Sequence, residues 1–209
     1  MESMVYKAIS AMLEKAAQNP ENLTETEKER LKSLRSVLNR ALAFSEHVAW
    51  EVHWRVEKFL SKTFDEVLAT GEQPYEVCSD VQNIILDTGA NEMLKLIGGV
   101  AGATAFSAAN AKIYVGSDST AEAASQTGVI ATTNKAYAGM DSGYPSVSGR
   151  TCVFRASFDD ATANFAWNEA AITNGSGAGA IAMNRKVSAL GTKTTGTWTL
   201  QLTISLTSV

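Results

Sequence analysis

Cysteine, proline and histidine are scarce in this sequence of 209 residues, which has two, three and two of them and a formal net charge of −4. Two thiols are too few for a disulfide framework, which favours synthesis in a reducing compartment. The chain has no run of about 18 apolar residues, and its N-terminus has no basic segment followed by an apolar one. We therefore expect no transmembrane helix and no secretory signal. The weak net charge makes nucleic acid an unexpected partner.

Charged side chains are distributed unevenly along the chain. The first 100 residues carry 11 Lys+Arg and 16 Asp+Glu, whereas the last 109 residues carry 7 and 6. Surface helices need long charged side chains on their outer face, while strands can be solvated by Thr, Ser and Asn. We therefore predict a segregated α+β chain. Residues 1–90 would form a helical attachment or oligomerisation region, and residues 91–209 an antiparallel β-sandwich or jelly-roll-like domain.

The first half contains several signals for helix starts and stops. Thr24 and Glu27 fit a capping box, and apolar residues at helical spacing continue from there to a C-cap at Gly71. At about 1.5 Å per residue this helix would span roughly 65–70 Å, a length that favours contacts with neighbouring chains. Residues 75–97 are predicted to form one or two further helices, which end at Gly98-Gly99.

The second half shows the two-residue period of strands. Trp198, Leu200, Leu202, Ile204 and Leu206 alternate with polar residues, as is typical of a half-buried strand. Further strand candidates, separated by turn-rich pieces, are Lys112–Val115, Val129–Thr132, Thr151–Phe158, Asn164–Thr173 and Ala180–Ser188. About six to eight short strands in this arrangement favour a sandwich or a jelly-roll-like unit.

Both histidines lie in one short segment of the predicted long helix. His47 and Glu51 are four residues apart, as are Trp50 and Trp54, so each pair would share a helical face. A His and a Glu at this spacing can bind a metal, but zinc needs a third ligand and the sequence offers none nearby. Because His53 is misplaced for an HExxH motif, we interpret the segment as a packing face and assign no metal ligand.

Other chemistry-bearing residues also lack partners in the sequence. Asp118 and Asp159-Asp160 could bind calcium from loops, but their spacing fits no EF-hand, so we interpret them as solvated turn residues. Glu169 has no second acid at a spacing that defines a glycosidase pair. Residues 175–179 (GSGAG) lie between two strands, which favours a hairpin over a phosphate-binding loop. We predict no catalytic, cofactor-binding or metal-binding residue and no enzymatic activity.

From about Asn91 to Val209 the chain carries an ordered set of short motifs. A strand ending in Phe158 is followed by Ala163-Asn164-Phe165-Ala166-Trp167-Asn168-Glu169, then by a glycine turn and Met183-Asn184-Arg185-Lys186, and before them comes Ala111-Lys112-Ile113-Tyr114-Val115-Gly116. This order resembles β-domains of accessory structural proteins in tailed-bacteriophage virions, of the tail-fibre or head-decoration type. The resemblance implies a homotrimer or a hexamer-associated protein without enzymatic activity.

The leading hypothesis is a head or neck fibre, or a capsid decoration element, that docks through its helical half and displays the β-domain. Its partners would be other copies in a homotrimer and capsid, neck or tail proteins, and it would reach the virion after synthesis in the host cytoplasm. The alternative is a tail-fibre, receptor-binding or carbohydrate-binding module that contacts a host-surface glycan through aromatics such as Tyr144 or Trp167. A virion-associated hydrolase using Glu169 and a loop aspartate is the least favoured hypothesis. We expect no cofactor, nucleic-acid or membrane partner.

Overall fold

A period of two residues, and not helical periodicity, organises most of the described part of this chain. The computed structural model describes residues 24–26, 28–29, 32–33, 48–81 and 83–208. The chain divides into two units, one with residues 1–48 and 208–209 and the other with residues 49–207. In the first unit, residues 25–26, 28–29 and 32–33 are helical, and the Lys28 amide donates to the Thr24 carbonyl at 3.0 Å.

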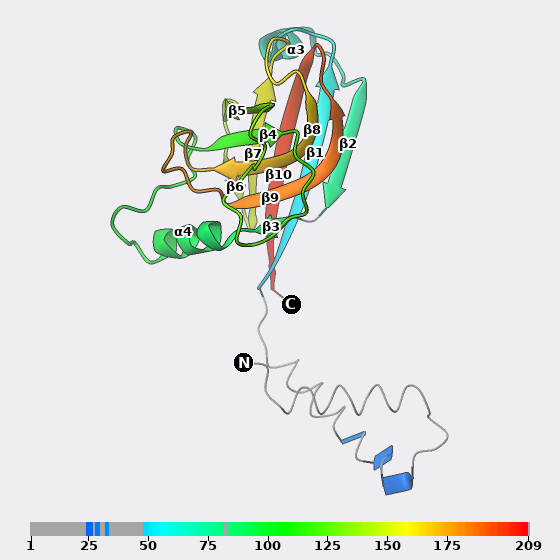
Figure 1. Cartoon of the computed structure of the whole chain (residues 1–209), viewed down its shortest axis with the longest axis vertical. Coiled ribbons are helices and arrows are strands. Elements are labelled where there is room, and N and C mark those ends of the chain that lie inside the picture. Colours follow the sequence, from blue (N-terminus) through cyan, green and yellow to red (C-terminus); the bar gives the residue numbers. More distant parts are fainter. Residues whose placement is uncertain (1–23, 27, 30–31, 34–47, 82, 209) are drawn as a thin grey trace. The chain divides into compact units, whose positions relative to one another are not determined.

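The strands of the second unit, called the β unit below, form two antiparallel sheets of five strands each (Figure 1). One sheet has the order β2-β1-β10-β7-β6, with the bounds β1 Val48–Phe59, β2 Glu76–Val81, β6 Ser146–Ser148, β7 Thr151–Phe158 and β10 Thr197–Ser208. The other has the order β3-β9-β8-β4-β5, with the bounds β3 Ile84–Ile85, β4 Lys112–Gly116, β5 Lys135–Gly139, β8 Ala166–Thr173 and β9 Asn184–Thr192. Two helices, α3 (Phe64–Thr70) and α4 (Asp87–Ile97), connect strands of the β unit.

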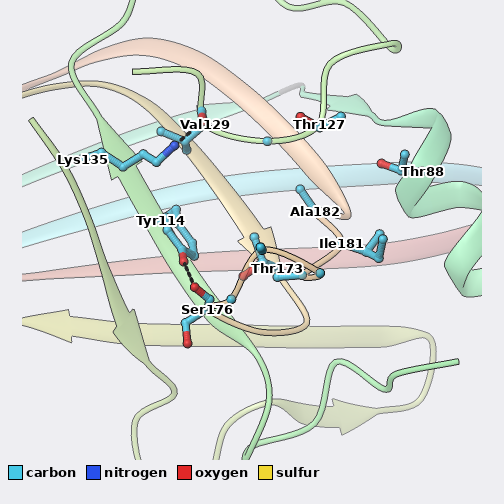
Figure 2. Close-up of a pocket in the computed structure, with 14 residues that line it drawn as sticks. Thr88, Tyr114, Thr127, Val129, Lys135, Thr173, Ser176, Ile181 and Ala182 are labelled. Carbon is cyan, nitrogen blue, oxygen red and sulfur yellow. Dashed lines mark hydrogen bonds between the residues drawn. The ribbon is translucent and has the colours of Figure 1, made fainter. Parts of the chain in front are cut away.

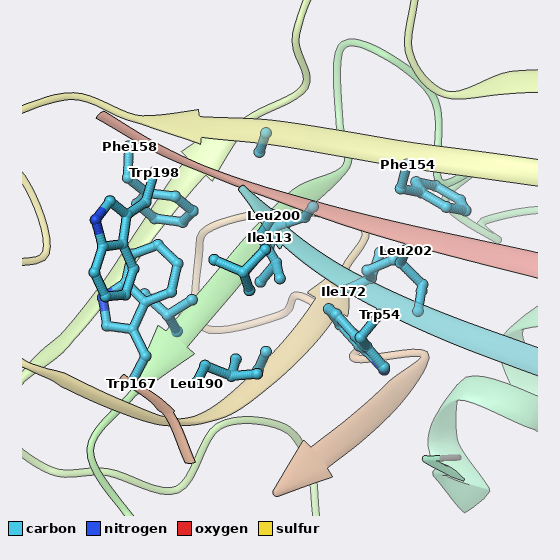
Figure 3. Close-up of a cluster of buried hydrophobic side chains, with 14 of the residues drawn as sticks. Trp54, Ile113, Phe154, Phe158, Trp167, Ile172, Leu190, Trp198, Leu200 and Leu202 are labelled. Atoms are coloured by element: carbon cyan, nitrogen blue, oxygen red, sulfur yellow. The ribbon is translucent and has the colours of Figure 1, made fainter. Parts of the chain in front are cut away.

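One hydrophobic core contains side chains from both sheets. Leu200 and Leu202 of β10 are buried in it, as the alternation in the sequence predicts. At one end of the core the rings of Phe158, Trp167 and Trp198 pack edge to face, with centroids 4.8 and 5.0 Å apart (Figure 3). Each such ring pair adds about 0.5–1.5 kcal/mol beyond its buried area, so this cluster stabilises the contact between β8 and the opposite sheet.

The predicted long helix is wrong over residues 48–59, which form β1. Val52, Trp54 and Val56 are buried, and the polar residues between them are exposed. The burial of Val52 and Val56 fits a helix as well as a strand, because a spacing of four residues is about one helical turn and also two strand repeats. The buried Trp54 midway between them is compatible with a strand alone. The segregated α+β prediction is therefore wrong, and the described part of the chain is mainly β.

Helix α3 retains one end of the predicted helix and replaces the other. It ends at Gly71 as predicted, and this glycine has the left-handed φ of 65° that favours glycine. It begins at a capping box of its own, in which the Glu66 amide donates to the Thr63 hydroxyl and the Thr63 amide to the Glu66 carboxylate. The capping box predicted at Thr24 includes Glu27, which lies outside the described residues.

The helices predicted over residues 75–97 are partly wrong. Residues 76–81 and 84–85 form β2 and β3, and α4 alone is helical, ending at Gly98 as predicted. The predicted domain boundary between residues 90 and 91 falls inside α4. Gly89 lets this helix approach the chain at Met183, where a Cβ atom would overlap the Met183 carbonyl. The helix is thereby held against the segment that leads into β9.

Most strands predicted in the second half are confirmed. Lys112–Val115 corresponds to β4, Thr151–Phe158 to β7, Asn164–Thr173 to β8, and the C-terminal run to β10. The strand predicted over Ala180–Ser188 begins later, as β9. The strand predicted over Val129–Thr132 is wrong, because this apolar segment is a loop whose amides bind a buried carboxylate. The short strands β5 and β6 are not predicted.

Candidate functional site

The residues weighed as metal ligands do not assemble into a site. Glu51 and His53 lie on β1 with exposed side chains, and His47 lies outside the described residues. Trp54 is buried in the core, whereas Trp50 is 40% exposed, so the two tryptophans do not form the packing face of a helix. Nowhere in the described part of the chain do three His, Cys, Asp or Glu side chains gather in a way that could hold a metal ion.

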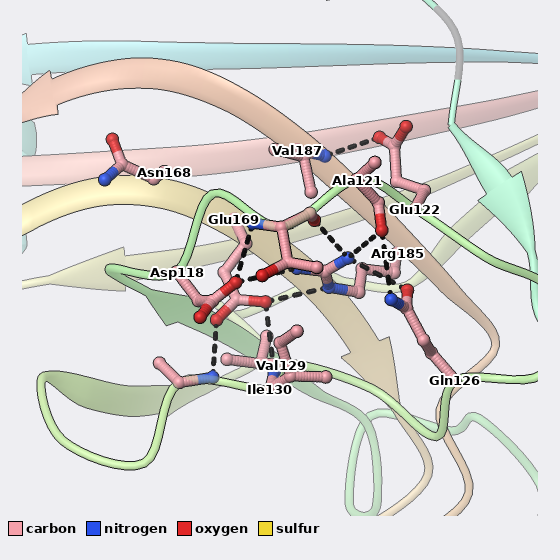
Figure 4. Close-up of polar contacts among 12 residues, drawn as sticks. Asp118, Ala121, Glu122, Gln126, Val129, Ile130, Asn168, Glu169, Arg185 and Val187 are labelled. Atoms are coloured by element: carbon pink, nitrogen blue, oxygen red, sulfur yellow. Dashed lines mark hydrogen bonds and ion pairs between the residues drawn. The ribbon is translucent and has the colours of Figure 1, made fainter.

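Glu169 is a fully buried carboxylate in β8 (Figure 4). It accepts hydrogen bonds from the amides of Ile130 and Ala131, at 3.0 and 2.8 Å, and from Arg185 Nε at 2.8 Å. Glu169 pairs with Val187 of β9 in the sheet, so Arg185 is its diagonal neighbour on the same face. The carboxylate holds a loop and an arginine, and a substrate cannot reach it in the folded chain.

The guanidinium of Arg185 holds the loop of residues 117–131 against the sheet (Figure 4). Its Nη1 donates to the Thr120 carbonyl at 3.0 Å and to Gln126 Oε1 at 2.9 Å. Its Nη2 lies 3.7 Å from Asp118 Oδ1, close enough for an ion pair but too far for a hydrogen bond. Hydrogen bonds from Thr120 hold the pKa of Asp118 below its usual value, and the charge of Arg185 adds to this effect. Asp118 is thus the outer member of a structural network.

The loop that begins at Asp159-Asp160 surrounds a buried lysine. Lys193 Nζ donates to the carbonyls of Asp159 and Asp160, at 2.9 and 3.3 Å, and to Asn164 Oδ1 at 2.8 Å. Burial lowers the pKa of Lys193, and the charges of the two aspartates partly offset this effect. Oxygen atoms that could have faced a calcium ion therefore face an ammonium group, and the loop is fixed by the protein's own cation.

The glycine-rich residues 175–179 belong to the hairpin between β8 and β9, as predicted, and they form one wall of a cavity of about 610 Å³ (Figure 2). We call this cavity the hairpin pocket. The Tyr114 hydroxyl donates to the Ser176 carbonyl at 3.2 Å, and Lys135 Nζ donates to the Val129 carbonyl at 2.9 Å. Burial of its hydroxyl raises the pKa of Tyr114. These polar groups hold the pocket's walls together.

A second cavity, of about 390 Å³, surrounds Arg155 of β7. The guanidinium contacts two aromatic rings, with Cζ 4.8 Å from the ring centroid of Phe64 and 4.7 Å from that of Tyr144. Its Nε donates to Asp141 Oδ2 at 2.8 Å, and the same oxygen accepts from the Ser157 hydroxyl at 2.9 Å. We call this cavity the Arg155 pocket; it is lined by Thr63, Phe64, Asp65, Leu68, Asp141, Ser142, Arg155, Ser157 and Asp159.

Sequence reasoning missed the Arg155 pocket. Its walls come from segments near residues 64, 141 and 156, and no motif links them. In the predicted long helix Phe64 lies near the C-terminal end, whereas in the structure it is the first residue of α3. Of the aromatics weighed as a glycan platform, Trp167 is fully buried and donates through Nε1 to the Ala163 carbonyl at 2.9 Å. Tyr144 contacts Arg155 and remains partly exposed.

Comparison of the chain with protein-family models, with curated proteins and with solved structures gives no match. Neither α3 and α4 nor the other helical residues in the described part of the chain combine the length and the apolar composition needed to cross a membrane. Function therefore has to be argued from the geometry of the β unit itself.

Proposed function

We propose that this chain is a non-enzymatic accessory structural protein of a tailed-phage virion, a head or neck fibre or a capsid decoration element. The β unit would be the displayed part, and the segment before β1 would attach it to the particle. The proposal builds on the motif order of residues 91–209. The observation that carries it is that the start of β1 and the end of β10 lie at the same end of the β unit.

The first residues of β1 and the last residues of β10 lie side by side at one end of the β unit (Figure 1). In the pairing of β10 with β7, Trp198 lies opposite Phe158, and Ser205 lies opposite Thr151. The last residue of β1, Phe59, approaches the turn before β10 at Gly196. The turn before β10 and the end of β1 therefore lie at the α3 end, while the start of β1 and the end of β10 lie at the other. A unit joined to its attachment segment at one end leaves the opposite end free for display.

Buried charges in the β unit serve its rigidity. Glu169 and Arg185 fix a loop, and Lys193 fixes another. Lys58 of β1 lies 4.3 Å from the ring centroid of Trp198 and 2.7 Å from the carboxylate of Glu76 on β2. Buried charges that are held by hydrogen bonds and ion pairs favour one well-defined structure. This rigidity suits a domain that is exposed on the outside of a particle.

Apolar side chains at the end of α4 offer a contact surface. Leu94, Ile97 and Val100 are all exposed, and they lie within seven residues of one another in the sequence. Exposed apolar patches on stable proteins are often contact sites. Other copies in a homotrimer, or a capsid, neck or tail protein, are the partners that we propose for this surface.

The proposal is tested by the native mass of the purified chain and by its presence on particles. We expect light scattering to give an oligomer, and the chain to sediment with phage particles produced by the host that carries its gene. A monomer at micromolar concentration that is absent from purified particles would overturn the proposal.

The copy number per particle, from quantitative gel analysis, separates the proposed locations. Many copies are expected for a decoration or head-fibre protein. Few copies would favour the alternative, a tail-fibre or receptor-binding protein, for which the Arg155 pocket is the observation that counts.

A further inference from the structure

The Arg155 pocket combines a fixed guanidinium with unused hydrogen-bonding groups. Arg155 donates a hydrogen bond from Nε to Asp141. Neither Nη atom of Arg155 donates one within the described part of the chain, so their donors remain for a ligand. Contacts with the rings of Phe64 and Tyr144 and the hydrogen bond to Asp141 hold the guanidinium in place. A side chain that is already fixed loses little entropy when it binds a ligand, and this is the condition for an effective binding group.

Acceptors lie beside these donors. Asp141 uses Oδ2 for Arg155 and Ser157, and Asp159 uses Oδ1 for the Phe64 amide at 2.9 Å. The second oxygen of each carboxylate is available to a ligand. Ser142, which is exposed at the rim, can donate or accept. The pocket thus presents donors and acceptors side by side, as a ligand with hydroxyl groups on adjacent carbon atoms requires.

The charges of the pocket select against charged ligands. Asp65, Asp141 and Asp159 bring three negative charges, and Arg155 brings one positive charge. An anion would meet a net negative wall, although it would also meet the guanidinium. A metal ion would be repelled by the positive charge of the neighbouring guanidinium. Its candidate ligands Asp141 and Asp159 also already accept hydrogen bonds from the protein. A neutral ligand avoids both penalties.

The geometry points to a binding site for a neutral sugar in the Arg155 pocket. A cavity of about 390 Å³ is within the size range of small-ligand sites. Leu68, which is exposed at its rim, can contact the C–H groups of a sugar ring. Phe64, Asp65 and Leu68 of α3 line this pocket, so it lies at the α3 end of the β unit. That this sugar belongs to a glycan on a host cell rests on the proposed function, whereas sugar binding itself does not.

The test is a titration of the isotopically labelled full chain with methyl glucoside, methyl galactoside and methyl mannoside, followed by amide NMR shifts. We expect at least one of these neutral sugars to shift the amides around residues 64, 142 and 157. Glucuronate and glucosamine, which carry a charge on a similar ring, should bind more weakly. Absence of shifts at these amides with all three neutral sugars would overturn the proposal, as would tighter binding of either charged sugar.

Two variants assign the binding to the pocket. Arg155→Lys keeps the charge but removes the planar fork, and Ser142→Tyr fills the rim without touching the Arg155–Asp141 pair. Each should weaken the binding about tenfold or more, since each removes contacts with charged groups or blocks access to them. Ser176→Tyr, at an exposed serine of the hairpin pocket, is the matched control and should bind as the wild type does.

Unchanged affinity in both pocket variants would overturn the assignment even if Arg155→Lys were less stable, because Ser142 is an exposed turn residue and its replacement tests the pocket without altering Arg155. Sugar binding by a chain that is absent from particles would leave the pocket in place and overturn the proposed function. Association with particles without sugar binding would support the proposed function and overturn the sugar-binding site.

Discussion

Two arginine–carboxylate pairs of the β unit have the same contact geometry and different surroundings. In both pairs Nε donates to a carboxylate oxygen at 2.8 Å. The side chains of Arg185 and Glu169 are 0% exposed, whereas those of Arg155 and Asp141 are 22% and 10% exposed. Arg185 also donates from Nη1 to three groups of a loop, while Arg155 lines a cavity.

The difference shows which property separates a structural ion pair from a candidate binding group. The distance between the charged atoms does not separate them, because it is the same in both pairs. What differs is whether the remaining donors are used within the protein. Arg185 is enclosed by loop residues 117–131, which accept from its Nη1, whereas Arg155 makes its hydrogen bond within the described residues through Nε. The predictions below test this contrast, from the largest expected effect to the smallest.

Replacing Arg185 with leucine should have the largest effect on stability. Arg185→Leu leaves the Glu169 carboxylate buried without its cation, and breaking a buried pair in this way costs about 3–5 kcal/mol. The free energy of unfolding, measured with urea and tryptophan fluorescence, should fall by this amount. Lys62→Leu, which removes an exposed cation just before α3, is the control and should cost less than about 1 kcal/mol. A loss below about 1 kcal/mol in Arg185→Leu would mean that burial does not make this pair structural.

Replacing Arg155 with methionine should have a smaller effect. Arg155→Met keeps an unbranched chain beside the rings and removes a partly exposed ion pair, worth about 0.2–1 kcal/mol, and two cation–π contacts, worth about 0.5–1 kcal/mol each. We expect unfolding in urea to show a loss of about 1–2 kcal/mol. Tyr144→Leu removes one of the two ring contacts and should show a fraction of that loss. A cost for Arg155→Met equal to that of Arg185→Leu would remove the contrast between the pairs.

The sequence predicts the centre of the β unit better than its edges. The alternation from Trp198 to Leu206 identifies β10 because every second residue is large and apolar over ten positions. β1 is missed because Val52 and Val56, four residues apart, also fit a helix. Short edge strands such as β6, with three residues, offer too few positions for any period to show.

The contacts of one arginine pair can be predicted from the sequence, and those of the other cannot. Glu169 and Arg185 lie on neighbouring strands of one hairpin, so a correct register for β8 and β9 would bring them together. A charged residue within each of two apolar strands was the available signal. Arg155 meets Phe64 and Tyr144 through tertiary packing of three separate segments, and no local pattern encodes that meeting.

Asp118 provides the smallest and most specific test, because it is the partly exposed outer member of the Arg185 network. Hydrogen bonds from Thr120, with a contribution from Arg185, place the pKa of Asp118 below its unfolded value of about 3.9. A carboxyl group whose pKa is lowered by folding stabilises the protein above its unfolded pKa, and this contribution is lost as the pH falls through the folded pKa. The wild type should therefore be more stable than Asp118→Asn at neutral pH, and the urea midpoints of the two proteins should converge below about pH 4. If the difference stayed constant through the acid range, the charge of Asp118 would contribute nothing to folding. In that case Arg185 would be balanced by Glu169 alone, and the buried pair would be independent of its exposed neighbour.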